Sequence, residues 1–95
     1  MRVAIGSDHA GFVLKQHLAE ALRTAGHEVL DLGTGSTVSV DYPDYGRAVG
    51  AAVADGKATL GVAICGSGIG ISIAANRVRG ARCARCTSEW DARFA

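Results

Sequence analysis

The sequence predicts an α/β fold with a Rossmann-like, mostly parallel sheet and helices on both faces. Short apolar runs rich in β-branched residues alternate with segments in which apolar residues recur at helical spacing. Glycine-containing or polar turns separate these segments. That alternation is typical of a parallel sheet with right-handed crossovers. No linker, repeat or low-complexity stretch divides the 95 residues, so a single domain over 1–95 is expected.

Each expected strand is a short apolar run that precedes a turn. The four runs lie at residues 2–5, 27–32, 60–64 and 81–86. The first scarcely alternates in polarity, as expected of a central strand buried on both faces. Helices are expected after the first three runs. The helix that begins near residue 12 should bury Leu14 and Leu18 and expose Lys15, because those leucines recur at helical spacing.

Turn and cap residues indicate where the helices begin and end. Gly26 occupies the expected position just after the first helix. Asp41 is expected to be the N-cap of the second helix, with Pro43 early in its first turn. Ser88, followed three residues later by Asp91, resembles a capping box for a last helix of barely two turns.

Composition excludes several classes of partner. The net charge is +1 and the basic residues are spread along the chain, so neither nucleic acid nor an anionic membrane is an expected partner. The N-terminal run is too short for a secretory segment, and no apolar stretch approaches membrane-spanning length. We therefore expect a cytoplasmic protein. A core this small also favours a homo-oligomer, such as a dimer.

The three cysteines are an odd number, which favours free thiols over a disulfide framework. Cys83 and Cys86 form a C-x-x-C pair without a second pair of ligands. A redox or zinc protein that uses these two thiols is an alternative function.

Cys65 stands out because it follows an apolar run and precedes a glycine-rich turn. The turn contains Gly66, Gly68 and Gly70, with Ser67 and Ile69 between them. Glycines let backbone N–H groups approach a ligand, and the N-terminus of the next helix favours negative charge. The G-x-G-x-G spacing is not the dinucleotide fingerprint. A thiolate at this position can act as a base or nucleophile, and a buried structural cysteine is the alternative.

Asp8 and His9 follow the first strand, just as the glycine turn follows the third. Ligands of parallel α/β folds bind at the carboxyl ends of the strands, so both turns should open on one edge. His9 is then suited to contact a phosphate and Asp8 a sugar hydroxyl, while a solvated turn is the alternative. Tyr42 either contacts the ligand or packs at the edge of the domain.

Four segments carry a resemblance to a known family. They are GSDHAGF at 6–12, LK at 14–15, DYPDY at 41–45 and ICGSGIGISIAAN at 64–76. In order and spacing they resemble the ribose-5-phosphate isomerase B family and the related isomerases for galactose 6-phosphate and allose 6-phosphate. The similarity runs from the start of the chain to about Cys86.

This resemblance implies a metal-independent aldose–ketose isomerase, without a cofactor, that interconverts ribose 5-phosphate and ribulose 5-phosphate through an enediolate. Cys65 matches the family's catalytic base. The turn from Gly66 to Gly70 matches the backbone cradle for the oxyanion, with Ser67 where many members have threonine. Asp8 and His9 match the substrate-binding pair, with His9 toward the phosphate.

The chain also departs from the family pattern. The family's ring-opening histidine, a neighbouring asparagine and its phosphate-binding arginines follow the matched region and have no counterpart in this sequence. Arg85 places a charge in an expected strand where relatives are usually apolar. The sequence thus resembles an isomerase shortened at its C-terminus, with impaired activity. A non-catalytic sugar-phosphate-binding or assembly module, or an isomerase for another sugar phosphate, is the alternative.

Overall fold

The computed structural model describes residues 1–95 and contains one three-stranded parallel sheet. The strands are β1 (Arg2–Ser7), β2 (Glu28–Asp31) and β3 (Leu60–Ile64). The helices are α1 (Phe12–Thr24), α2 (Tyr42–Ala54), α3 (Ile69–Asn76) and α4 (Glu89–Phe94). None of the helices has both the length and the apolar character needed to cross a bilayer.

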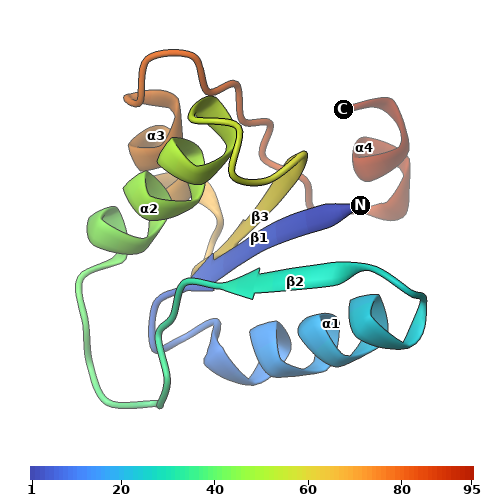
Figure 1. Ribbon diagram of the computed structural model, residues 1–95. Helices are drawn as coiled ribbons and strands as arrows, with labels where there is room; N and C mark the ends of the chain where they lie inside the picture. The colour runs from blue at the N-terminus through green and yellow to red at the C-terminus, as the bar shows by residue number, and fades with distance from the viewer.

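The strand order β2-β1-β3 places β1 in the centre of the sheet. The step from β1 to β2 and the step from β2 to β3 run in opposite directions across the sheet. Right-handed crossovers therefore place α1 and α2 on opposite faces, as Figure 1 shows. This arrangement confirms the predicted α/β class. The carboxyl ends of β1 and β3 are neighbours, because Ser7 lies opposite Ile64 in the register.

The core consists largely of small side chains. Ala4, Ala52 and Ala58 form its buried cluster, and Leu30 and Leu32 pack against it. Residues this small let α2 lie close to the sheet.

Two glycines of α2 set the position of α3. A Cβ atom on Gly46 would come within 2.8 Å of the carbonyl oxygen of Ile71, and one on Gly50 within 2.9 Å of that of Ala75. Both distances are shorter than real Cβ contacts, so only glycine permits this approach. Residues 65–68, which we call the cysteine turn, lie between β3 and α3. Because α3 begins directly after this turn, the packing of α2 against α3 also places the turn.

The expected strand at 81–86 is absent, and this prediction was wrong. The side chain of Asn76 takes both backbone groups of Cys83: its Nδ2 donates to the carbonyl and its Oδ1 accepts from the N–H, each at 2.8 Å. With these groups occupied, Cys83 cannot pair with β3 by its backbone. β3 therefore remains an edge strand of the sheet.

The expected orientation of α1 was wrong for Leu14 and Lys15, whereas Leu18 is partly buried. Leu14 is 59% exposed, whereas Lys15 is 1% exposed and is buried together with Ala19. The reason is an ion pair, because the ammonium of Lys15 reaches Asp31 at the end of β2. A helical pattern that counts lysine as polar cannot reveal such a partner.

The helix ends agree in part with the sequence. Gly26 follows α1 at a φ of 93°, as expected of a glycine just after a helix. Asp41 is the N-cap residue of α2, but its side chain makes no capping bond. The Oγ of Ser88 accepts the N–H of Asp91 at 3.1 Å, which confirms the cap of α4. α4 packs against no other helix or strand.

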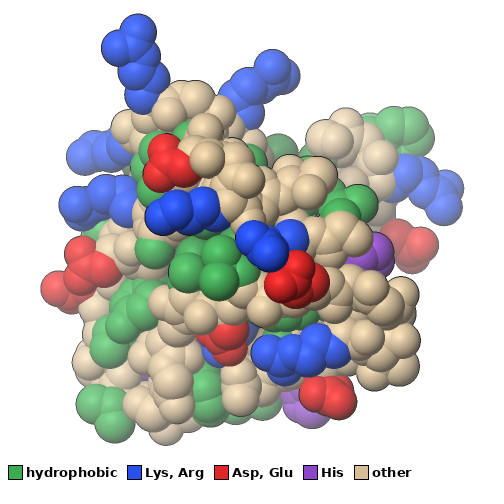
Figure 2. All heavy atoms as spheres, viewed as in Figure 1, with side chains coloured by type: hydrophobic (Ala, Val, Ile, Leu, Met, Phe, Trp, Pro, Cys, Tyr) green, Lys and Arg blue, Asp and Glu red, His purple; other side chains and the backbone are tan.

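Acidic and basic side chains are interspersed over the face of the molecule seen in Figure 2. This distribution agrees with the net charge of +1.

Candidate active site

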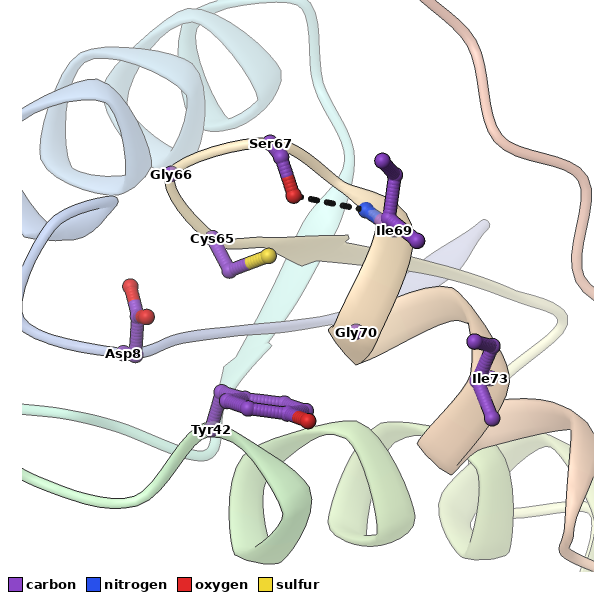
Figure 3. Close-up of a pocket in the computed structure, with 8 residues that line it drawn as sticks. All are labelled: Asp8, Tyr42, Cys65, Gly66, Ser67, Ile69, Gly70 and Ile73. Atoms are coloured by element: carbon purple, nitrogen blue, oxygen red, sulfur yellow. Dashed lines mark hydrogen bonds between the residues drawn. The ribbon is translucent and has the colours of Figure 1, made fainter.

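A hollow of about 530 Å³ opens where β1 and β3 end and where α2 and α3 begin. Figure 3 shows the residues around it, which belong to α2 and α3 or to the turns that follow β1 and β3. The lining residues are Asp8, Tyr42, Cys65, Gly66, Ser67, Ile69, Gly70 and Ile73. The two turns that were expected to open on one edge of the sheet therefore do meet in one site.

Cys65 follows the last residue of β3, and its side chain points toward the start of α3 (Figure 3). The N–H of Gly68 donates to the Sγ atom at 3.1 Å. Gly68 is the N-cap residue of α3 and has a φ of 79°, a conformation that favours glycine. The sulfur thus lies at a helix N-terminus and accepts an N–H bond. Both features stabilise negative charge on it.

Asp8 is 7% exposed and belongs to a tight turn after β1. Its Oδ1 accepts the N–H of Gly11 at 3.0 Å, and its own N–H donates to the carbonyl of Ile64 at 3.1 Å. The second bond ties the Asp8 turn to the residue just before Cys65. The carboxyl and the thiol are consequently held on one rigid edge of the sheet.

Tyr42, the first residue of α2, lies against Gly70 of α3. A Cβ atom on Gly70 would come within 2.6 Å of the tyrosine ring. The absence of a side chain at Gly70 therefore provides the space for this ring. Ile69 and Ile73 leave about half of their side chains exposed and give the hollow an apolar wall.

Every lining residue except Ile73 was expected from the sequence. Ile73 stands four residues after Ile69, so helical spacing would have placed the two on one face of α3. Gly68 does not line the hollow, although its N–H reaches the thiol.

His9 lies beside the hollow rather than on its wall. Its Nδ1 accepts the N–H of Val40 at 3.1 Å, which ties the loop before α2 to the turn after β1. A neutral His9 that accepts at Nδ1 carries its proton on Nε2. No protein group bonds Nε2, so this N–H is available to a ligand.

No lysine or arginine lines the hollow. No group of three or more His, Cys, Asp or Glu side chains forms a cluster that could hold a metal ion. Cys83 and Cys86 lie outside the hollow. Burial, followed by the nearby Cys86, raises the pKa of the Cys83 thiol.

Comparison with known proteins shows the family to which the chain belongs. A sequence profile of the family described as ribose/galactose isomerase matches residues 3–95. The chain belongs to the ribose/galactose isomerase family. Ribose-5-phosphate isomerase B of Escherichia coli is 44% identical over 93 residues, which are 98% of this chain and 62% of that protein.

Two further relatives are also similar to nearly the whole of this chain. Galactose-6-phosphate isomerase subunit LacB of Clostridium acetobutylicum is 43% identical over 95 residues, which are 100% of this chain and 55% of that protein. The solved structure of ribose-5-phosphate isomerase B from Clostridium thermocellum has a TM-score of 0.96 and 51% identity, covering 99% of this chain and 64% of that one. The chain thus spans less than two thirds of the length of these relatives.

Proposed function

We propose that this chain is an aldose–ketose isomerase of sugar phosphates, with ribose 5-phosphate and ribulose 5-phosphate as its substrates and Cys65 as the base. One observation carries the proposal: the Cys65 thiol accepts an N–H bond at a helix N-terminus, inside a hollow that it shares with Asp8. Membership of the ribose/galactose isomerase family supports this choice of reaction.

In this proposal the Cys65 thiolate takes the proton from carbon 2 of the open-chain aldose. The electron pair of that bond forms a double bond between carbons 1 and 2, and the carbonyl oxygen on carbon 1 becomes the oxyanion. The thiol then returns its proton to carbon 1, while the hydroxyl proton on carbon 2 moves to the oxygen on carbon 1. The ketose results, and the thiolate is restored.

The developing oxyanion needs hydrogen-bond donors that are free before the substrate binds. The backbone N–H groups of Gly66, Ser67 and Gly70 find no acceptor within the protein. The first N–H groups of a helix have no partner in the helix itself, and they point toward its N-terminal end. We therefore assign the oxyanion cradle to this turn.

For substrate binding we assign the sugar hydroxyls to Asp8 and one face of the sugar to Tyr42. The phosphate is assigned to His9, whose Nε2 has no partner in the protein. Because no lysine or arginine lines the hollow, phosphate binding by these residues alone should be weak. We accordingly expect a high KM and slow turnover for the chain on its own.

A second candidate substrate is galactose 6-phosphate, because LacB of Clostridium acetobutylicum is almost as similar as the ribose-5-phosphate isomerase of Escherichia coli. A sugar-phosphate-binding module without catalysis is the other alternative. Such a module would bind the sugar phosphate at the same backbone N–H groups, and the Cys65 thiol would transfer no proton.

A coupled isomerase assay with ribose 5-phosphate and with galactose 6-phosphate tests these proposals. Cys65→Ala should lower kcat by about 100-fold or more, the usual contribution of a positioned base, and should leave thermal stabilisation by ribose 5-phosphate almost unchanged. Cys86→Ala is the matched control, because Cys86 is exposed and lies outside the hollow. Equal activity of Cys65→Ala and the parent would contradict the role of the thiol. Stabilisation by the sugar without turnover in the parent would favour the binding module.

The homo-oligomer expected from the sequence also remains a proposal, as does the cytoplasmic location. The outer edge of β3 is unpaired, and Leu60 on that strand is exposed. An unpaired edge favours association with another chain. Light scattering of the purified protein would test for a dimer.

A further inference from the structure

We propose that Arg85 is a positioning residue for Cys65, acting through the peptide bond between Ser67 and Gly68. The Nε of Arg85 donates to the carbonyl oxygen of Ser67 at 2.9 Å. The N–H of the same peptide, which belongs to Gly68, donates to the Cys65 sulfur at 3.1 Å. Arg85 and Cys65 are therefore joined through a single peptide group. The catalytic meaning of this contact rests on the proposed function.

A peptide group is planar, so its C=O and N–H cannot turn independently. When Arg85 holds the oxygen of the Ser67–Gly68 peptide, the N–H on the other side stays directed at the sulfur. Gly68 has a φ of 79° and no side chain, so the glycine itself offers little resistance to rotation of this peptide. The arginine supplies a restraint that the turn would otherwise lack.

The charge on Arg85 adds an electrostatic effect. A charged donor on a carbonyl polarises the whole amide, and linked hydrogen bonds strengthen one another. The Gly68 N–H becomes a better donor to the sulfur, which favours the thiolate over the thiol. Arg85 thus supports the ionised form of Cys65 without touching it.

Arg85 lies over the turn because the segment after α3 is fastened nearby. Two residues before Arg85, both backbone groups of Cys83 are bonded by the side chain of Asn76, a residue of α3. The stem of Arg85 covers Gly68, where an added Cβ would lie 3.5 Å from the arginine Cγ. Because residues 81–86 do not form a strand, Arg85 is in contact with the cysteine turn.

Alkylation of Cys65 by iodoacetamide, followed across about pH 5 to 10, tests this role without requiring turnover. Trypsin cleavage after Lys57 and Arg77 releases residues 58–77, in which Cys65 is the only cysteine, from the parent and from every variant. The variants are Arg85→Leu, which removes the donor, and Arg85→Lys, which keeps a charged donor of similar length. Arg82→Leu is the matched control, because Arg82 is an exposed arginine of the same segment without a bond to the turn.

We expect Arg85→Leu to be alkylated about three- to tenfold more slowly than the parent near neutral pH, the effect of one hydrogen bond. The two rates should converge at high pH, where both proteins carry the thiolate. Arg85→Lys should recover part of the difference, and Arg82→Leu should match the parent. If Arg85→Leu lowers the melting temperature below that of the assay, Arg85→Gln takes its place.

If Cys65 of Arg85→Leu is alkylated at the same rate as Cys65 of the parent at every pH, the positioning role is overturned. Faster alkylation of Arg85→Leu at every pH would overturn it as well. The two proposals can fail separately. If the alkylation profile of Arg85→Leu differs from that of the parent but the parent has no isomerase activity, the positioning role stands and the proposed function is contradicted. Isomerase activity in the parent, with an alkylation profile that Arg85→Leu leaves unchanged, would support the proposed function and contradict the positioning role. If both proposals hold, Arg85→Leu should lower kcat with little change in KM.

Discussion

The ammonium of Lys15 lies 2.7 Å from Oδ2 of Asp31, although the lysine is only 1% exposed. The same ammonium donates to Oε1 of Gln16 and lies over the ring of Phe12. The second carboxylate oxygen, Oδ1, accepts the N–H of Gly33. One ion pair thus joins α1 to the end of β2 and to the loop that follows it.

The two partners should contribute unequally to stability. Asp31→Ala leaves a buried ammonium without its counter-charge and should lower the free energy of unfolding by about 2 kcal/mol, less than for a fully buried pair because Asp31 is partly exposed. Lys15→Met leaves a carboxylate that water can reach, and should cost about 1 kcal/mol or less. Urea denaturation of both variants measures the difference. A larger loss for Lys15→Met would contradict this account.

The same ion pair predicts a pH dependence. Burial alone would raise the pKa of Asp31, but the hydrogen bonds from Lys15 and Gly33 and the charges of Lys15 and Arg23 outweigh it and lower the pKa. The folded protein therefore holds this proton more weakly than the unfolded chain. The contribution to stability is complete above the unfolded pKa, about 3.9, and is lost as the pH falls through the folded value.

Melting temperatures measured between about pH 2 and 6 test this dependence. Lys15→Met removes the partner that lowers the pKa of Asp31, so the acid-induced loss of stability should be shallower in this variant. An equally steep loss in both proteins would mean that other carboxylates dominate.

Gly46 and Gly70 should respond differently to alanine. At Gly46 the added Cβ meets the backbone of Ile71 at 2.8 Å, which cannot move without displacing α3, and we expect a loss of about 2 kcal/mol or more. At Gly70 the added Cβ meets the far end of the Tyr42 ring, which can rotate away, so a loss below about 1 kcal/mol is expected. Gly70→Ala should instead weaken binding of ribose 5-phosphate. Thermal unfolding and calorimetric titration separate the two effects.

Ser88→Ala should destabilise only α4. The substitution removes the side-chain cap and should cost that helix about 1 kcal/mol. Because α4 packs against no other element, the melting temperature of the whole protein should hardly change. Amide exchange should be faster within α4 and unchanged in β1. A fall in the global melting temperature would reveal packing of α4 in solution.

His9→Ala should release the loop before α2. The substitution removes the acceptor of the Val40 N–H, so the exchange of this amide should become about threefold faster or more, the effect of one lost hydrogen bond. His17→Ala is a suitable control, because His17 is an exposed residue of α1. Unchanged exchange at Val40 would show that other contacts hold the loop.

The sequence alone determined the class of fold and where the site would form. The apolar run at 60–64 corresponds to β3 without any shift, because a short apolar run between turn residues is typical of a strand. Parallel strands bring their carboxyl ends to one edge, so the meeting of Asp8 and Cys65 followed from the order of the elements. The roles assigned to these residues remain predictions.

Tertiary structure decided which side chains find partners across the fold. Lys15 was expected in solvent and is buried, since its partner Asp31 lies on another element. Residues 81–86 were expected to form a strand, yet the side chain of Asn76 bonds both backbone groups of Cys83. Arg85 reaches Ser67, 18 positions away in the chain. A local sequence pattern indicates only the secondary structure that a segment favours. These contacts join residues that come close to each other only after the sheet and helices have packed.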